Sequence, residues 1–573
     1  MQTNKGGQTK PSGLNHIFLT CKRALLFAAL FSFGINVLTL ASPLYSLQVF
    51  DRVLSSGSME TLLMLSIIVL ILFLFLGALQ AIRSFVFMQI GAWMDKKLSP
   101  AFLIASIRIS ALQKTLSGSQ ALRDLGTVKQ FITGQPLQQL FDAPWAIIFI
   151  LVLFLIHPII GGIVCLFALI LFGMAIINEW QTKKPHDEAN DAYVKNMKDV
   201  EMMTRNADVI ESMGMVTSIV TLWDAVNLNA VNKHIEANRK ATIIASITKT
   251  IRMTIQMVTM AVSTYLVLAN KMTPGGIIAA SILSGKALAP FDAAIATWKS
   301  VLGARKAYRR LKTVEEKAPD RDEAMTLPEP DGKLTAEKLF YAIQGSPKPI
   351  LKAIDFELQA GEAMGLIGPS AAGKTTLAKC IVGVWKPSSG IVRLDDADIY
   401  TWNREQVGQY VGFLPQEIEL FHGTVKDNIA RMNPAADPQT VIDAAKIAGC
   451  HQMILKLPQG YDTQIGVSGS KLSAGQRQRI GLARAFYGTP KLIVLDEPNA
   501  HMDQVGEAAL LKALDHAKNH AITVIVISHR PSILAKIDKV LVLNDGQLQQ
   551  FGPRDEVLAT VMPKAIQKHG GAS

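Results

Sequence analysis

Six long apolar runs in the first 300 residues constrain the fold of this chain more than any other feature. They cover roughly residues 24–44, 61–82, 143–157, 158–178, 246–269 and 274–297. A membrane-spanning helix needs about 20 apolar residues. Charged residues make up only 18% of the chain, below the roughly 25% of soluble proteins. The sequence therefore predicts a six-span α-helical membrane domain.

Residues 145–177 contain no charged residue apart from the ionisable His157, and they are too many for one kinked span. We expect a helical hairpin with a tight turn at His157 and Pro158. The fifth and sixth runs contain Lys249, Arg252 and Lys286. Because intramembrane charge is costly, we expect these two runs to line a cavity rather than face lipid on all sides.

Lysine and arginine cluster before the first run and in the long connections that follow the second and fourth runs. The other connections are short and hold few cations. The positive-inside rule therefore places both termini and both long loops in the cytoplasm. The loops have helical patterning, so we expect the spans to continue past the bilayer. Since the first run is long and five more follow, an uncleaved anchor is favoured over a signal peptide.

The bulk composition limits the classes of partner and cofactor. A chain of 573 residues exceeds one ordinary core, so at least two domains are expected. The net charge of +12 fits cations that flank membrane spans. No basic patch with interleaved aromatic residues appears, so no nucleic-acid partner is expected. The four cysteines, Cys21, Cys165, Cys380 and Cys450, lack metal-ligand spacing and are interpreted as small apolar residues.

A phosphate-binding loop follows in the second half, where residues 365–377 read GLIGPSAAGKTTL. The pattern G-x-x-x-x-G-K-[ST] lets backbone N–H groups approach phosphate oxygens, while the lysine reaches the β- and γ-phosphates and Thr375 binds Mg²⁺. An apolar strand at 363–367 precedes the loop, and we expect a helix over 377–384. The predicted ATP-binding residues are Gly368, Pro369, Ser370, Ala371, Ala372, Gly373, Lys374, Thr375 and Thr376.

Polar residues end three further apolar strands, predicted at 411–414, 491–495 and 522–527. Carboxyl ends of parallel strands are where open α/β sheets bind ligands. We predict that Asp496 holds Mg²⁺ through water and that Glu497 polarises the attacking water. His529 is placed to touch the γ-phosphate, and Gln416 to ligate Mg²⁺ or hold water.

A second anion site opens the helix of SKLSAGQRQRIGLARA at residues 470–485. Ser473 and Gln476 have the S-x-x-Q form of a capping box, and free N–H groups at a helix start bind anions. The chain therefore has one complete phosphate site, the phosphate loop, and a second, partial one at the start of this helix.

These motifs resemble ABC-type ATPases over residues 334–560, with Leu472–Gln476 as the signature sequence. The resemblance implies a homodimer of twelve spans, in which Ser473, Ala474, Gly475 and Gln476 close on ATP held by the partner, and Asp503 lies at the seam. Ala474 departs from the usual glycine, which is tolerable at negative φ. Ile343 falls where the family often has an aromatic residue against adenine, with Tyr341 two before, so weaker stacking or apolar contact is expected.

The membrane half is similar to type I secretion ATPases, most of all to the protease-secretion branch. The stretches that carry this resemblance are PLYSLQVFDRVLSS at 43–56, FDAPWAIIF at 141–149, NADVIESMGM at 206–215 and TPGGIIAASILSGKALAPFDAAIATWK at 273–299. The resemblance implies export of an unfolded protein with a C-terminal signal across the inner membrane of Gram-negative bacteria. It also implies a periplasmic adaptor (membrane fusion protein), an outer-membrane channel and membrane lipid as partners.

The expected organisation is a cytoplasmic segment at 1–23, a membrane domain at 24–315, a linker at 316–333, an α/β P-loop ATPase domain at 334–562 and a tail at 563–573. We hypothesise that residues 206–215 and 123–135 hold short coupling helices, with a plain solvated helix as the alternative. Three rival functions stay open at this point: an exporter of lipid or a small amphiphile, a structural or DNA-repair ATPase, and an ATP-gated channel.

Overall fold

The computed structural model describes residues 14–112, 119–318, 326–343, 348–466, 469 and 471–561. The chain divides into two compact units, residues 1–319 and 320–573, each with its own hydrophobic core. Part of the expected N-terminal segment, part of the expected linker and the whole expected tail lie outside the described residues.

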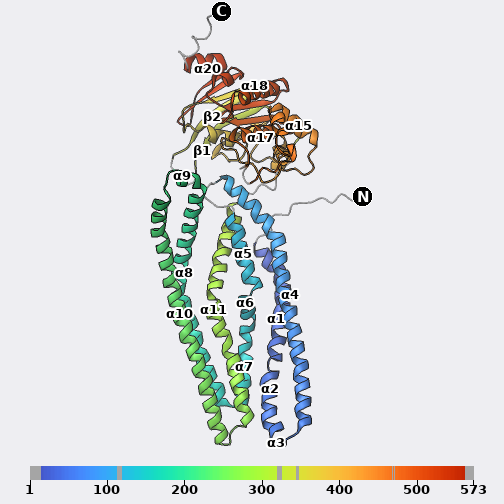
Figure 1. Ribbon diagram of the computed structural model, residues 1–573, viewed down its shortest axis with the longest axis vertical. Coiled ribbons are helices and arrows are strands. Elements are labelled where there is room, and N and C mark those ends of the chain that lie inside the picture. The colour runs from blue at the N-terminus through green and yellow to red at the C-terminus, as the bar shows by residue number, and fades with distance from the viewer. Residues whose placement is uncertain are drawn as a thin grey trace, which may run out of the picture. The chain divides into compact units, whose positions relative to one another are not determined.

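The described part of the first unit is helical, with six helical stretches long and apolar enough to cross a membrane (Figure 1). The six candidate spans are Arg23–Ser56, Met59–Leu112, Gln120–Ile156, Pro158–Arg205, Val216–Leu268 and Pro274–Lys317. The prediction of six spans is confirmed. The helices are α1 (Leu14–Leu38), α2 (Ala41–Gln48), α3 (Leu54–Ser56), α4 (Met59–Leu112), α5 (Ser119–Thr133), α6 (Gln135–Asp142), α7 (Ala146–Ile156), α8 (Pro158–Arg205), α9 (Ala207–Ser212), α10 (Val216–Leu268) and α11 (Pro274–Lys317).

The predicted hairpin is confirmed, because α7 ends at Ile156 and α8 begins at Pro158. His157 between them is extended, and its Nδ1 accepts a hydrogen bond from the N–H of Ile159 at 3.2 Å. Pro158 at the first helical position loses no helical hydrogen bond. The continuation of the spans is also confirmed, since α4 has 54 residues where about 20 suffice to cross the hydrocarbon.

The segment from Arg123 to Gln135 does not form the separate short helix expected there, and that prediction is wrong. It belongs to α5 and the start of α6. Leu125, Val128 and Ile132 repeat on one face of α5 and are buried in the core shared with α4 and α11, as an amphipathic helix requires. The short helix expected within 206–215 is present as α9.

Asp51 connects two of the stretches singled out in the sequence. It lies in a π-helical turn, Val49–Val53, just after α2. Its carboxylate accepts hydrogen bonds from the hydroxyl of Thr273 at 2.6 Å and from the N–H of Gly275 at 2.7 Å. These groups belong to the start of α11, whose first N–H groups have no helical partner. The stretch 43–56 thus caps the sixth span.

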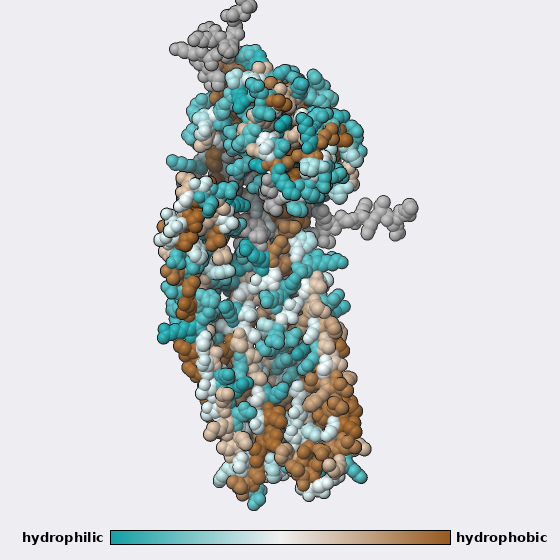
Figure 2. All heavy atoms as spheres, viewed as in Figure 1, coloured by the Kyte–Doolittle hydropathy of each residue, from teal (hydrophilic) through white to brown (hydrophobic). Residues whose placement is uncertain are grey.

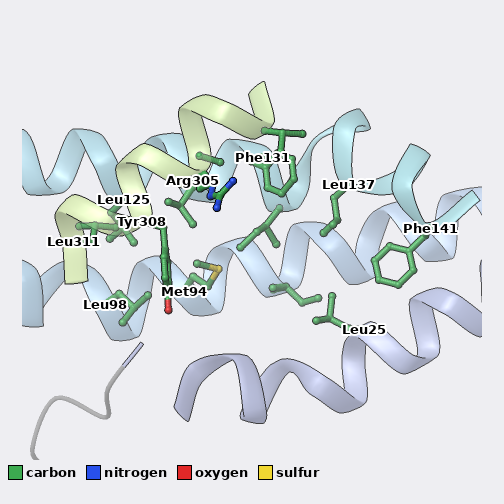
Figure 3. A pocket seen from close by; sticks show the side chains of 15 residues that line it. Leu25, Met94, Leu98, Leu125, Phe131, Leu137, Phe141, Arg305, Tyr308 and Leu311 are labelled. Carbon is green, nitrogen blue, oxygen red and sulfur yellow. The ribbon is translucent and has the colours of Figure 1, made fainter. Parts of the chain in front are cut away.

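Hydrophobic residues gather around α2, α3 and α7 on the visible face of the first unit, whereas the visible face of the second unit is largely hydrophilic (Figure 2). An apolar cavity of about 410 Å³ lies among α1, α4, α5, α6 and α11. Leu25, Met94 and Phe131 are among its walls, and only Arg305 and Tyr308 of its lining carry polar side-chain groups (Figure 3).

The second unit is an α/β domain with two sheets in its described part. The larger sheet has the order β10-β9-β3-β8-β7-β6, and β9, β3, β8, β7 and β6 are parallel; the smaller, antiparallel sheet has the order β2-β1-β4-β5. The strands are β1 (Leu334–Tyr341), β2 (Leu351–Leu358), β3 (Ala363–Ile367), β4 (Ser389–Leu394), β5 (Ala397–Asp398), β6 (Val411–Leu414), β7 (Leu492–Asp496), β8 (Thr523–Ile527), β9 (Lys539–Asn544) and β10 (Gln547–Pro553).

Both faces of the large sheet are covered. Successive strand residues such as Ile493 and Val494 belong to different hydrophobic clusters, since successive side chains of a strand point to opposite faces. The helices are α12 (Lys374–Ile381), α13 (Arg404–Tyr410), α14 (Val425–Ile429), α15 (Pro438–Ile447), α16 (His451–Leu455), α17 (Ala474–Phe486), α18 (Gln504–Asn519), α19 (Pro531–Leu534) and α20 (Arg554–Val561). Burial on both faces explains the continuous apolar runs of β7 and β8.

Candidate nucleotide-binding and active site

The predicted site residues that follow strands lie at one edge of the large sheet. The phosphate loop follows β3, His529 follows β8, Glu497 follows β7 and Gln416 follows β6. These four strands are neighbours and all parallel, so their carboxyl ends meet at the same edge. Asp496 is the last residue of β7 rather than the residue after it, a one-residue difference in the strand boundary.

The phosphate loop runs directly into α12, which begins at Lys374 and not at Leu377 as expected. Gly373 caps the helix with φ of 99°, a left-handed conformation that glycine adopts without strain. Lys374, Thr375 and Thr376 therefore form the first helical turn, whose free N–H groups suit an anion. Ala371 is also left-handed, with φ of 65°, which is unfavourable for a residue with a Cβ.

The ammonium group of Lys374 lies over the loop, where it donates to the carbonyls of Gly368 at 2.6 Å and Pro369 at 2.9 Å. Burial lowers the pKa of Lys374, and the charges of Glu497 and Asp496 oppose that shift. Phosphate oxygens are stronger acceptors for an ammonium than these carbonyls. The lysine is therefore held beside the place where a phosphate would bind.

Asp496 is 1% exposed, and its Oδ2 has no hydrogen-bond partner among the described residues. Burial raises its pKa, and a hydrogen bond with the Thr375 side chain acts against that rise. A buried, unpaired carboxylate oxygen is costly. Carboxylate and hydroxyl oxygens are ligands that Mg²⁺ prefers, so Thr375 and Asp496 fit the predicted metal site.

Glu497 and Gln416 contact each other directly. The Nε2 of Gln416 donates to the Oε2 of Glu497 at 3.0 Å. The N–H of Glu497 donates to the carbonyl of Ile527 at 3.1 Å, which ties the residue to the end of β8. Its φ of 48° is left-handed, and such strain persists where surrounding contacts enforce it. His529, two residues past β8, is exposed.

The capping box predicted at the start of α17 is confirmed. The hydroxyl of Ser473 accepts from the N–H of Gln476 at 3.2 Å, and the Gln476 side chain accepts from the N–H of Ser473 at 2.8 Å. Ala474 is the first helical residue and is not left-handed, so its methyl group is tolerated as expected. A Cβ at Gly475 would lie 2.9 Å from the carbonyl of His501, tighter than ordinary contact.

The remaining predicted residues have structural partners of their own. Asp503 caps α18 by accepting from the N–H of Gly506 at 2.7 Å. Tyr341 stacks on Trp385, with ring centroids 5.0 Å apart and planes 9° apart. Ile343 is 53% exposed and borders residues 344–347, which lie outside the described residues. Weaker stacking or apolar contact from Ile343 stays the prediction for adenine.

The sequence reasoning missed side chains that hold these loops together. Glu507 of α18 accepts from Arg530 and from the hydroxyl of Ser532, both just past His529. Its place in the first turn of a capped helix is the only signal for it in the sequence. Two further hydrogen bonds brace the turn after Glu497: Gln478 donates to the carbonyl of Pro498 at 2.7 Å, and Ser528 bonds Asn499 at 3.0 Å.

Comparison with known proteins matches both units. Residues 25–289 match the family model described as ABC transporter transmembrane region, and residues 351–500 match that described as ABC transporter. The chain is 37% identical over 570 residues to the type I secretion system ATP-binding protein PrsD of Rhizobium meliloti, covering 99% of this chain and 97% of PrsD.

More distant relatives and a solved structure agree with this match. The exotoxin translocation ATP-binding protein PaxB of Pasteurella aerogenes is 27% identical, with 92% of this chain and 75% of PaxB covered. A bacterial Atm1-family ABC exporter, solved with ATP bound, superposes with a TM-score of 0.80 at 20% identity, covering 94% of this chain and 96% of that chain. The fold is therefore that of an ABC exporter.

Proposed function

The chain belongs to the ABC transporters as the ATPase component of a type I secretion system, and from this premise we propose how it works. It exports an unfolded polypeptide with a C-terminal signal across the bacterial inner membrane. It acts as a homodimer, with both termini in the cytoplasm, together with a periplasmic adaptor and an outer-membrane channel. The observation that carries this proposal is the 37% identity to PrsD over nearly the whole of both chains.

In the proposed reaction, ATP lies on the N–H groups of the phosphate loop and the start of α12, with Lys374 at its β- and γ-phosphates. Mg²⁺, held by Thr375, Asp496 and Gln416, would neutralise phosphate charge. Glu497 accepts a hydrogen bond from the attacking water and orients it in line with the γ-phosphate, while His529 contacts that phosphate. The contact between Gln416 and Glu497 supports a shared role for these two residues.

The half-site at Ser473–Gln476 serves the partner subunit's ATP in this proposal. Cargo enters an inward-facing cavity between the two subunits. When both ATP molecules are enclosed between a phosphate loop and the partner's signature sequence, the cytoplasmic side of this cavity closes, and hydrolysis reopens it. Asp503 would lie at the seam between subunits. The short helix α9 would couple this closure to the membrane helices. Support for α9 is its place between α8 and α10, which are among the longest helices of the described chain.

Thiol cross-linking tests the dimer. Cysteines introduced at Ser370 and Ser473 should link separate subunits when ATP is present. The native Cys380 and Cys450 are buried, and burial raises the pKa of each thiol to about 12, so neither competes in the reaction. Bonds formed only within single subunits, or none at all, would refute reciprocal ATP sites.

Glu497→Gln tests the catalytic assignment. This variant should keep ATP binding, lose at least about a hundredfold in turnover and accumulate as a closed dimer. Near-normal hydrolysis would show that Glu497 is not the catalytic residue.

The cargo is tested by stimulation of the ATPase with a peptide of a few dozen residues from the C-terminus of a co-encoded secreted protein. Stimulation by lipid instead, without need of an adaptor, would favour an exporter of lipid or a small amphiphile.

A further inference from the structure

A polar cavity of about 250 Å³ lies among α1, α4, α6, α7 and α11 of the membrane unit. Its charged lining residues are Arg83 of α4, Asp142 of α6 and Lys286 of α11. Asn36 and Gln139 add amide groups. Apart from Gln139, these residues lie within or directly beside the apolar runs of the sequence. Charged groups at such positions are costly and mark functional sites more often than structural ones.

Arg83 and Asp142 form an ion pair with each other. The Nη1 of Arg83 donates to the Oδ1 of Asp142 at 2.7 Å and to the hydroxyl of Ser32 at 2.8 Å. The Nδ2 of Asn36 donates to the same carboxylate oxygen at 3.2 Å. Arg83 is 6% exposed. The carboxylate of Asp142 is therefore already neutralised by Arg83 and is not free to pair with Lys286.

Lys286, the third charged residue of the cavity, takes no part in this ion pair. Its side chain is exposed and, among the described residues, no carboxylate lies within ion-pair distance of its Nζ. Asp292, the acidic residue in the middle of α11, pairs with Arg252 of α10 at 3.0 Å. Asp51 is bound to the start of α11. The cavity thus holds two cations against one carboxylate, an excess of positive charge.

One regular helical hydrogen bond is missing in the lining, and two of its buried side-chain atoms have no partner among the described residues. Pro290 lines the same cavity and has no N–H, so the carbonyl of Lys286, four residues earlier, lacks its helical donor. The Nε of Arg83 and the Oε1 of Gln139 are buried and have no partner among the described residues. The volume is sufficient for several waters or a side chain. The lining therefore offers a cation for a carboxylate and acceptors for peptide N–H groups.

We propose that Lys286, backed by Arg83, forms a binding site for carboxylates of an acidic, unfolded segment of the exported chain. This inference rests on the proposed export function and names a chemical class for its cargo. Aspartate or glutamate side chains neutralise Lys286 in turn, while the Lys286 carbonyl accepts from the backbone of the passing segment. A single ion pair binds such a segment weakly enough for release.

The test uses the full-length transporter in phosphatidylcholine nanodiscs. The probes are three fluorescent, unstructured 20-residue Gly-Ser peptides that contain four aspartates, four lysines or no charge. Binding is followed by anisotropy, and ATP hydrolysis is measured in the same preparation. The variants are Lys286→Gln and Lys286→Glu. Lys249→Gln on α10 is the matched control, because it removes the same charge from an exposed lysine of the fifth run that does not line the cavity.

We expect the aspartate peptide to bind wild type about tenfold more tightly than the neutral peptide, as one charged hydrogen bond predicts. Lys286→Gln should remove this preference, Lys286→Glu should transfer it to the lysine peptide, and Lys249→Gln should retain it. Equal binding of all three peptides to wild type, or an equal loss in Lys249→Gln, overturns the inference alone. Binding of no peptide at all, with normal ATP hydrolysis, also overturns the inference, while the export function is judged separately by the stimulation of the ATPase with the C-terminal peptide.

Anionic lipid is the other ligand that could neutralise Lys286. Nanodiscs of phosphatidylglycerol distinguish binding of an anionic lipid from binding of an acidic peptide segment. If Lys286→Gln changes ATP hydrolysis only in phosphatidylglycerol and leaves the preference for the aspartate peptide intact, the lysine binds lipid headgroups, and the inference is wrong.

Discussion

Removing Arg83 should destabilise the membrane unit by an amount that the geometry of its ion pair predicts. Arg83→Met deletes the bonds to Asp142 at 2.7 Å and Ser32 at 2.8 Å. Breaking a buried ion pair from one side costs about 3–5 kcal/mol, because the remaining charge is left uncompensated. Asp142 keeps its 3.2 Å bond from Asn36, and its side chain is 29% exposed. The loss of folding free energy in Arg83→Met should therefore lie at the lower end of this range, at about 3 kcal/mol.

The assay is thermal unfolding of the detergent-solubilised full chain, followed by size-exclusion chromatography with fluorescence detection. A loss of about 3 kcal/mol lowers Tm by roughly 6–12 °C, at about 2–4 °C per kcal/mol. Asp142→Leu should cost more, about 4 kcal/mol, because the more deeply buried guanidinium is then left alone. The double variant Arg83→Met/Asp142→Leu should recover to within about 1 kcal/mol of wild type. A double variant as unstable as either single variant, or an Arg83→Met variant that unfolds like wild type, would refute the reasoning.

Three further predictions concern the nucleotide unit. Ala371→Gly should raise the unfolding temperature, because it relieves about 1–2 kcal/mol of left-handed strain against roughly 0.5–1 kcal/mol of added chain entropy; a lower temperature would contradict this. Glu507→Ala, which frees Arg530 and Ser532 beside His529, should lower kcat for ATP several-fold with KM unchanged, and a change in KM alone would indicate a different role. Because burial raises the pKa of Asp496, a lower pH protonates a larger share of this metal-binding carboxylate. The KM for MgATP should therefore rise as the pH is lowered from 7.5 to 5.5; a pH-independent KM would count against Asp496 as a ligand.

Local patterns were sufficient to predict the features that depend on neighbouring residues. The hairpin at His157 follows from an apolar stretch too long for one span, and the capping box of Ser473 and Gln476 follows from their spacing of three. The edge shared by Gln416 and Glu497 follows from the rule that parallel strands end together. The fifth and sixth runs are predicted to line a cavity because intramembrane charge is costly; Lys286 of the sixth run lines the polar cavity, whereas Lys249 and Arg252 of the fifth run do not.

Contacts between distant segments could not be predicted in this way. Arg83 and Asp142 are 59 residues apart, and nothing in either helix specifies which residue of the other it meets. The π-helical turn that brings Asp51 to Gly275 has no sequence signal of its own. The error at Arg123–Gln135 has a different cause, since the segment was placed in a cytoplasmic loop, whereas Leu125 and Val128 are buried in the helical core.

The length of the helices gives small rotations a large effect. The 53 residues of α10 form a rod of about 80 Å at 1.5 Å per residue, against about 30 Å of hydrocarbon. A tilt of about 5° around its middle displaces each end by roughly 3.5 Å in opposite directions. Proline interrupts the hydrogen bonding of α4 at Pro100 and of α8 at Pro185, but α10 contains none. Among these three helices, α10 alone has no proline at which it could bend. A movement at one of its ends is therefore transmitted to the other end.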